Sequence, residues 1–272
     1  MKIFLLTDIP IWVRPLEQAL QAQGAEVVVG LSVPEHFRPD RFVNRVSTAI
    51  LRRKSARVPE LAALLRSAEA AGGHVINGAQ CFEVGLSKLG QRDIFLASGA
   101  KTPETASLSL GKRAFPDRSV LLKPGGGGFG RGIRRLVPNE PIPEDLKLSD
   151  DWVEQVALTP SDGRVHRLEF LGTEILYHAS SPWQVGEYDY CLANVGEAAQ
   201  LAAGRTLPDA VAGPARSIAQ RGGLQLGALE YFLMSDGRPV FIDFNPVSSL
   251  HPNAFELFGR DPLDLVAEYI LS

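Results

Sequence analysis

The chain has 272 residues, of which 45% are hydrophobic and 22% are charged, and this balance excludes a disordered or fibrous protein. The 28 basic and 31 acidic residues give a net charge of −3, so the overall charge does not favour nucleic acid or an anionic membrane as a partner. The two cysteines, Cys81 and Cys191, are too few for a disulfide framework or a cysteine zinc site, and we expect a cytoplasmic location. No uninterrupted apolar run approaches the roughly 18 residues that a membrane-spanning helix needs.

The first 77 residues alternate between strand-like and helix-like patterns. The opening apolar run is interrupted at Asp8, which makes it too short for a signal peptide and typical of a buried strand. Pro59 should break or kink the helical period in which it lies. In chain order the predicted elements are a strand at 2–9, a helix at 15–23, a strand at 26–29, a helix at 47–71 and a strand at 74–77. This alternation predicts a small parallel α/β domain over residues 1–77.

From residue 78 onward, helices give way to strands and hairpins. A helix at 87–98 ends at Gly99, and Pro103 disfavours helix in the connector that follows. The remaining predicted elements are strands at 119–123, 133–137, 151–156, 165–170, 174–178, 227–233 and 239–244, helices at 197–203, 209–221 and 262–271, and a surface loop at 136–149. The fold class is therefore expected to be α/β followed by α+β.

Residues 119–135 read SVLLKPGGGGFGRGIRR and contain five glycines within six positions. Gly125, Gly127 and Gly130 have the spacing of a dinucleotide-binding loop, but a strand-like segment follows where that loop requires a helix, and no Lys-Ser/Thr completes a Walker loop. The pattern instead predicts a β-hairpin flap whose backbone amides approach a polyphosphate, with Lys123 at the end of the incoming strand. The alternative is an ordinary surface hairpin with a solvated lysine.

Residues 227–245 predict a second hairpin, which carries acidic side chains. A two-residue turn at Asp236-Gly237 would place Glu230 directly opposite Asp243, with Asn245 two residues on and on the same face. Two carboxylates in directly opposite positions repel each other, and a cation between them removes that cost. Oxygen ligands without His or Cys suit Mg²⁺ or Mn²⁺, which commonly use one or two carboxylates together with substrate phosphates.

The same register divides the hairpin's apolar residues between its two faces. Phe232 and Phe241 would lie on the acidic face, where they could flank a flat base, and the other face would be entirely apolar core. The core residues so predicted are Leu229, Tyr231, Leu233, Val240, Ile242 and Phe244. The alternative is a solvated edge of a half-exposed sheet, and a longer loop would shift the register on which this prediction depends.

Other charged side chains are ambiguous when each is taken alone. Lys88 lies on a predicted helix, where a lysine is most often solvated. Arg167 shares a strand face with Glu169, and a surface ion pair is the simpler interpretation of the two. His166 and His178 have no metal-ligand spacing and are expected to be structural or peripheral.

Several short motifs, in this order and spacing, resemble the ATP-grasp superfamily, and within it the ribosomal-protein-S6 glutamate ligase branch and related α-L-glutamate-type carboxylate–amine ligases. The motifs are 44–47 (NRVS), 74–78 (HVING), 87–91 (SKLGQ), 99–105 (GAKTPET), 122–124 (LKP) with the glycine run, 153–155 (VEQ), 167–170 (RLEF), 229–231 (LEY) and 243–246 (DFNP). The resemblance implies an ATP-grasp fold preceded by a small Rossmann-like α/β domain at 1–77. The N-terminal lobe of that fold would span 78–151 and carry the glycine-rich flap, and the C-terminal lobe would span 152–272 and carry the metal site.

The resemblance also implies ATP and two Mg²⁺ ions as cofactors, with Mn²⁺ able to replace Mg²⁺. By this resemblance, Lys88 and Lys123 would bind the phosphates, and a flap with Gly127, Gly128, Phe129 and Gly130 would close over them. The hinge residues Glu154, Gln155 and Val156 would contact the adenine, and Asp162 would contact the ribose. The metal ligands would be Glu230, Asp243 and Asn245, and Arg167 would contact the transferred phosphoryl group. Lys123 and Arg167 are the implied catalytic pair.

The implied activity is an ATP-dependent carboxylate–amine ligase that forms an amide or peptide bond through an acyl phosphate. Its partners would be small-molecule or peptide carboxylates and amines, without nucleic acid or membrane, and homo-oligomers are common among such relatives. Two departures leave the substrates open: Ala179 stands where many relatives carry an arginine, and the usual Gln-Glu-Tyr of the hinge is Glu154-Gln155-Val156. The alternatives are a regulatory nucleotide-binding protein on the same scaffold and a small-molecule kinase.

Overall fold

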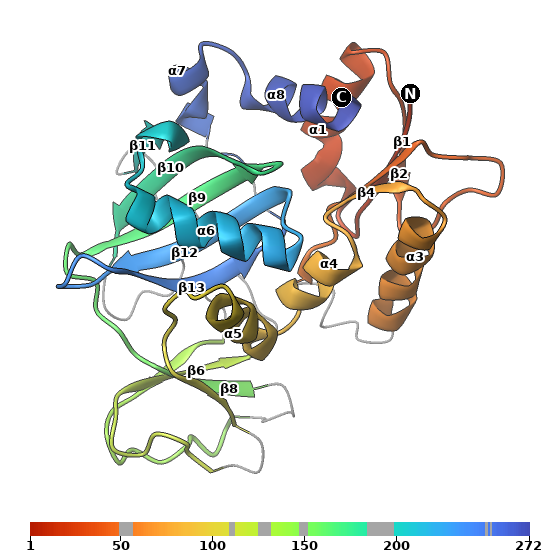
Figure 1. The fold of residues 1–272 in the computed structure, drawn as a ribbon. Helices are drawn as coiled ribbons and strands as arrows, with labels where there is room; N and C mark the ends of the chain where they lie inside the picture. The colour runs from red at the N-terminus through yellow and green to blue at the C-terminus, as the bar shows by residue number, and fades with distance from the viewer. Residues whose placement is uncertain are drawn as a thin grey trace.

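The computed structural model describes residues 1–48, 57–108, 112–124, 132–146, 152–183, 199–247, 250 and 252–272. Three sheets organise these residues, and helices cover two of them (Figure 1). Two of the sheets are antiparallel and one is parallel, which confirms the predicted mixture of α/β and α+β structure. In Figure 1 the parallel sheet lies beside the largest sheet, and the small sheet that contains β6 and β8 lies below it.

The first sheet is parallel throughout and has the strand order β2-β1-β3-β4. Alternate residues of β1 face opposite sides, so that Ile3 packs with α1 and α8 while Phe4 packs with α3. The C-terminal helix α8 thus covers the N-terminal sheet, and in Figure 1 it lies next to α1. The elements of this layer are β1 (Lys2–Leu6), α1 (Pro10–Ala22), β2 (Glu26–Gly30), β3 (Arg41–Asn44), α3 (Val58–Ala70), β4 (His74–Ile76) and α8 (Pro262–Leu271).

The helix predicted at 47–71 is seen as α3 from Val58 onward, and residues 49–56 lie outside the described residues. Pro59, which was predicted to break the helical period, lies in the first turn of α3, where its missing amide hydrogen has no intrahelical partner to lose. The strand β3 was not predicted, because its four residues are too few to show an alternating pattern.

The small sheet is antiparallel, with the strand order β5-β8-β6-β7. Its core is a cluster of buried aliphatic side chains that includes Leu108, Val120, Leu122 and Leu136. The predicted flap, with Gly127, Gly128, Phe129 and Gly130, lies outside the described residues. The strands are β5 (Thr105–Ser107), β6 (Val120–Pro124), β7 (Arg134–Leu136) and β8 (Trp152–Val156).

The largest sheet is antiparallel, with the strand order β11-β10-β9-β12-β13. Helices α4, α5 and α6 cover one of its faces, and α6 crosses in front of it in Figure 1. The segment 197–203 was predicted to be helical, but 200–203 pair with β10 as an edge strand. The elements are α4 (Ala79–Gly85), α5 (Lys88–Ala97), β9 (Arg164–Leu171), β10 (Glu174–Pro182), β11 (Gln200–Ala203), α6 (Asp209–Gly222), β12 (Leu226–Leu233) and β13 (Pro239–Asn245), with short turns at Gly204–Thr206, Pro252–Ala254 and Phe255–Phe258.

The hairpin of β12 and β13 has a different turn from the one predicted, yet it reaches the predicted pairing. The amide of Met234 donates to the Arg238 carbonyl (3.0 Å) and Gly237 has φ of 74°, which makes a three-residue loop instead of a two-residue one. The register near the turn is therefore shifted by one residue, and a β-bulge at Ile242 corrects the shift. Beyond the bulge, Glu230 lies directly opposite Asp243, as predicted.

The bulge also changes which apolar residues lie on each face. Phe241 packs in the helix-covered core with Tyr231, whereas Ile242 packs with Phe232 and Val165 in a separate cluster. The prediction that placed Phe241 on the acidic face and Ile242 in the core is therefore wrong, because one extra residue in a strand reverses the alternation around it.

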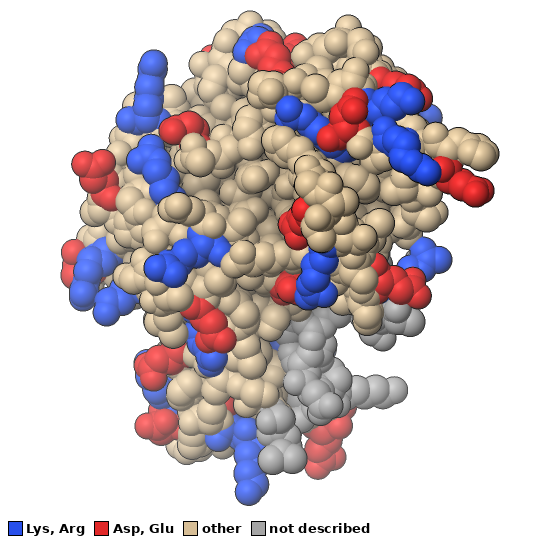
Figure 2. Space-filling view, turned by 45° about the vertical axis from the view of Figure 1, so that its right-hand side comes forward, with Lys and Arg blue, Asp and Glu red and all other residues tan. Residues whose placement is uncertain are grey.

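Charges of both signs are interspersed around the rim of the face seen in Figure 2, and uncharged residues cover its middle. Within the part of the chain that the structure describes, no helix combines the length and the apolar character needed to span a bilayer.

Candidate active site

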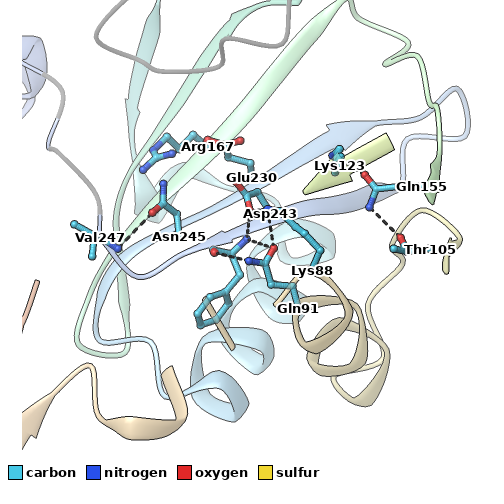
Figure 3. A network of polar contacts seen from close by, with 11 residues as sticks. Lys88, Gln91, Thr105, Lys123, Gln155, Arg167, Glu230, Asp243, Asn245 and Val247 are labelled. Atoms are coloured by element: carbon cyan, nitrogen blue, oxygen red, sulfur yellow. Dashed lines mark hydrogen bonds and ion pairs between the residues drawn. The ribbon is translucent and has the colours of Figure 1, made fainter. Parts of the chain in front are cut away.

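Two acids and an arginine meet on the face of the largest sheet that helices α4 to α6 leave uncovered (Figure 3). Strand pairing places Glu230 of β12 between Asp243 of β13 and Arg167 of β9. The Arg167 guanidinium donates through Nη1 to Glu230 Oε1 (2.6 Å) and through Nε to Glu169 Oε1 (2.7 Å). Glu230, Arg167 and Glu169 are all buried, so this charge network is shielded from solvent.

Burial and neighbouring charges both act on these groups. Burial raises the pKa of Glu230; Asp243 acts in the same direction, and Arg167 opposes it. Burial alone would lower the pKa of Arg167, but Glu169 and Glu230 outweigh it and hold the pKa above its ordinary value. Arg167 therefore stays charged, and the two acids that flank each other need a further cation to be ionised together.

Lys88 brings a second cation to the acids from the first turn of α5. Its ammonium donates to Asp243 Oδ1 and to Gln91 Oε1, the latter at 3.1 Å. Gln91 is buried and donates to the Phe244 carbonyl at 3.2 Å, so it docks α5 on β13 beside Asp243 (Figure 3). Sequence reasoning missed Gln91, although its spacing of three from Lys88 places both side chains on one helix face.

Lys123 supplies a third cation from β6 in the small sheet. Its ammonium donates to Gln155 Oε1 on the neighbouring strand β8 at 2.7 Å. Burial and the nearby Lys88 lower the pKa of Lys123 to about 8, and Asp243 and Glu230 oppose that shift. The two lysines therefore lie close enough to influence each other although they come from different layers of the fold.

The donor set fits Mg²⁺ that is shared with a nucleotide. Asn245 lies on β13 two residues beyond Asp243, and its Oδ1 accepts a hydrogen bond from the Val247 amide at 3.3 Å. Among the described residues, no group of three His, Cys, Asp or Glu side chains is arranged to hold a metal ion. Two carboxylates and an amide oxygen that need phosphate oxygens to complete the coordination are typical of Mg²⁺ sites.

An apolar cluster adjoins the acidic hairpin on the side of the turn. It contains Val165, Phe232 and Ile242, with Leu158 and Met234 packed against them. Leu158 lies in the connection that follows β8 and leads to β9, so the cluster borders both the small sheet and the largest one. This apolar surface is suited to the face of a flat ring.

Two of the hinge residues, Glu154 and Val156, make hydrogen bonds within the protein that the sequence does not predict. The Glu154 carboxylate is fully buried and accepts from Arg113 Nε (3.0 Å) and from the Ala114 amide (2.5 Å). The Val156 amide donates to the Glu104 carbonyl at 2.9 Å. Both oxygens of the Glu154 carboxylate are therefore used within the protein.

Asp162 and Arg45 have surroundings that the sequence does not reveal. Asp162 Oδ2 bonds to His166 Nε2 at 2.7 Å, in the connection from β8 to β9. Arg45, which follows β3 in the first sheet, donates to the Leu226 carbonyl (3.4 Å), and burial lowers its pKa to about 10 although nearby Glu169 opposes the shift. The N-terminal layer thus adds a cation next to the acids of the largest sheet.

Solved structures resemble this chain along its whole length. A RimK-domain ATP-grasp protein from Sphaerobacter thermophilus is 20% identical, with 100% of both chains covered and a TM-score of 0.66. The ATP-grasp ligase PsnB, solved with its precursor peptide and AMPPNP, is 16% identical over 99% of this chain and 97% of its own, with a TM-score of 0.65. D-alanine–D-alanine ligase from Bacillus anthracis, solved with ATP, is 12% identical over 100% and 96%, with a TM-score of 0.68.

No protein-family model and no curated protein matches the sequence. At these low identities the structural likeness concerns the fold, and it covers the three layers together instead of one of them. The chain therefore has the ATP-grasp fold.

Proposed function

We propose that the chain is an ATP-dependent ligase that joins a carboxylate to an amine through an acyl phosphate. The observation that carries the proposal is the directly opposed pair of buried Glu230 and half-buried Asp243, which lies beside the cations Arg167, Lys88 and Lys123. Such a pair is costly in a sheet unless a cation is bound there, and the surrounding cations suit a polyphosphate. The fold shared with ligases that are solved with ATP or with AMPPNP supports the same assignment.

The nucleotide would lie along the uncovered face of the largest sheet. Its base would contact the apolar cluster around Phe232 and Ile242, near Val156 and the hinge, with Asp162 towards the ribose. Its phosphates would reach Lys88 and Lys123. The glycine run with Gly127, Gly128, Phe129 and Gly130 would cover them as a flap.

Glu230, Asp243 and Asn245 would hold two Mg²⁺ ions, or Mn²⁺, against the phosphate oxygens. The ions would neutralise phosphate charge and orient the γ-phosphoryl group for in-line transfer. Binding of the ions would require Lys88 to exchange Asp243 for a phosphate oxygen, since its ammonium contacts that carboxylate here.

The reaction proceeds in two transfers. A carboxylate oxygen of the first substrate attacks the γ-phosphorus, the bond to the bridging oxygen breaks, and ADP leaves. The amine of the second substrate then attacks the acyl carbon, phosphate leaves with the electron pair of the C–O bond, and the amine proton passes to solvent. Arg167, held by Glu169 and Glu230, stabilises the negative charge that accumulates in both steps.

The substrates would be small-molecule or peptide carboxylates and amines, and the chain could act as a homo-oligomer. A related ligase, PsnB, is solved with a precursor peptide, which supports including peptides among the candidates. A screen for ADP and phosphate release across amino acids and peptides tests the proposal. We expect release that requires both a carboxylate and an amine, with an amide product.

Other outcomes of that screen would contradict the proposal. A phosphorylated acceptor that accumulates without amide would identify a kinase. Tight binding of MgATP without turnover for any acceptor would identify a regulatory nucleotide-binding protein.

The substitution Asp243→Asn tests the site itself. It removes one charge of the metal-binding pair while keeping the side-chain shape, and we expect kcat to fall by about 10²–10³-fold. Asp236→Asn is the matched control, because Asp236 lies in the exposed turn of the same hairpin. Wild-type turnover in Asp243→Asn, or equal losses in both variants, would contradict the assignment.

A further inference from the structure

A chain of hydrogen bonds runs from Lys123 through the small sheet. The Lys123 ammonium donates to Gln155 Oε1 (2.7 Å), Gln155 Nε2 donates to Thr105 Oγ1 (3.0 Å), and Thr105 Oγ1 donates to the Pro103 carbonyl (2.9 Å). Thr105 and Gln155 are directly opposite residues of β5 and β8, and Gln155 is a diagonal neighbour of Lys123 on the paired strands β8 and β6 (Figure 3). The three adjacent strands β5, β8 and β6 therefore each contribute a side chain to this series of hydrogen bonds.

The donor and acceptor roles in this series of hydrogen bonds are fixed by the chemistry of Thr105 and Lys123. Thr105 has a single hydroxyl hydrogen, which it donates to Pro103, so its oxygen must accept from the Gln155 amide. The amide oxygen of Gln155 then faces Lys123, whose ammonium can only donate. A flipped amide would oppose NH₂ to NH₃⁺, and the observed orientation is therefore the stable one.

Gln155 and Thr105 are held rigidly at the position where Lys123 needs a partner. Gln155 is 6% exposed and Thr105 is 7% exposed, and Arg92 donates to the Thr105 carbonyl at 2.8 Å. A neutral amide oxygen directs the ammonium without cancelling its charge, and Lys123 keeps further hydrogens for another acceptor. A carboxylate at position 155 would instead form an ion pair and compete with phosphate.

We infer that Gln155 and Thr105 are positioning residues that aim the Lys123 ammonium at the polyphosphate, and that the Gln155 side chain does not serve as an adenine contact. The inference rests on the proposed nucleotide site. It differs from the role that the family resemblance gives to Gln155, because both functional groups of the amide are already used within the protein.

Calorimetric binding of a non-hydrolysable ATP analogue with Mg²⁺, compared with adenosine, separates the two roles. In Gln155→Met the lysine loses its partner, and we expect the affinity for the ATP analogue to fall about tenfold while that for adenosine changes less than about twofold. An adenine contact would instead weaken both ligands equally. Equal losses, or no loss for the ATP analogue, would overturn the inference.

The pair Thr105→Val and Thr105→Ser provides a second test that leaves Lys123 and Gln155 intact. Thr105→Val removes the hydroxyl that orients the amide, and we expect a smaller loss in the same direction, selective for the ATP analogue. Thr105→Ser keeps the hydroxyl and should match the wild type. If Thr105→Val and Thr105→Ser bind the analogue equally, the inference fails even when Gln155→Met is too unstable to measure. A wild-type protein that binds neither ligand would refute the proposed function, and this inference with it.

Discussion

Buried titratable side chains occur on both faces of the largest sheet, and those on the helix-covered face have no part in the proposed chemistry. His166 Nδ1 and His178 Nε2 are 2.9 Å apart, and both rings stack with Tyr231. Burial lowers the pKa of His178 to about 4, and His166 and Arg164 act in the same direction. Burial also lowers the pKa of His166, against the opposing effect of Asp162.

These shifts predict a loss of stability in acid. The folded chain binds fewer protons at His178 than the unfolded chain does, so stability is fully present above about pH 6.5 and decreases as the pH falls towards 4. We expect His178→Gln to reduce the difference in free energy of unfolding between pH 7 and pH 4.5 by roughly 1–2 kcal/mol, as His178 is partly exposed. Urea unfolding at several pH values measures the effect.

His36→Gln is the control for that experiment, because His36 is exposed in a loop of the N-terminal layer. Its pH dependence should equal that of the wild type. A wild-type slope in His178→Gln would show that His178 does not contribute to acid sensitivity.

At the scale of elements, the contact between α6 and β13 supports the acidic hairpin from behind. Gly222 ends α6 against the Phe244 ring, and a Cβ at this position would lie 2.5 Å from a ring carbon. Phe244 is buried and follows Asp243 directly, so its ring has little room to move. Only a glycine allows α6 to approach the strand this closely.

Two glycines of α6 therefore predict different outcomes. We expect Gly222→Ala to destabilise the protein by about 1–3 kcal/mol, since the added methyl group must displace Phe244. Gly213 lies inside the same helix, and no atom other than those of its chain neighbours lies within 4 Å of the position of a Cβ. The higher helix propensity of alanine is opposed there by the ring of Pro214, so Gly213→Ala should change the free energy of unfolding by less than about 0.5 kcal/mol. Thermal unfolding of the two variants provides the measurement, and equal losses in both would contradict this account of the packing.

At the scale of the whole molecule, one buried asparagine joins the parallel sheet to the largest one. Asn77 follows β4 with φ of 57°, and its Nδ2 donates to the carbonyls of Leu226 (2.5 Å) and Pro246 (2.8 Å). Its Oδ1 accepts from the amides of Gln225 (2.9 Å) and Leu226 (3.0 Å). These bonds hold the open end of the acidic hairpin, next to Asn245.

Replacing this amide should weaken the junction between the layers. Asn77→Asp puts a carboxylate oxygen against two carbonyl oxygens, and we expect a loss of about 2–4 kcal/mol in the free energy of unfolding. Asn139→Asp is the matched control, since Asn139 also has a positive φ (62°) but lies exposed in a loop. Denaturant unfolding should show no more than about 0.5 kcal/mol for the control. Similar losses in both variants would mean that backbone conformation, and not the hydrogen bonds, is what matters at Asn77.

The sequence predicted most of the elements because their patterns are local. The helix that begins after Ser87 has a capping side chain and a glycine after its end, and the strands of the acidic hairpin alternate clearly. The helix predicted at 197–203 is wrong because the apolar and small residues there suit a helix as well as an edge strand, and only pairing with β10 decides between the two. The predicted two-residue turn is wrong because Asp-Gly also occurs in three-residue loops, and the loop here comprises residues 235–237.

The sequence by itself determined that two acids belong on one face of a terminal hairpin, since alternation along a strand is a local property. Only the tertiary structure decided what surrounds them. The bulge at Ile242, the approach of Lys88 from α5 and the chain from Lys123 to Thr105 depend on contacts between residues far apart in the sequence. Spacing along a chain carries little information about such contacts, because they depend on how the layers pack against one another.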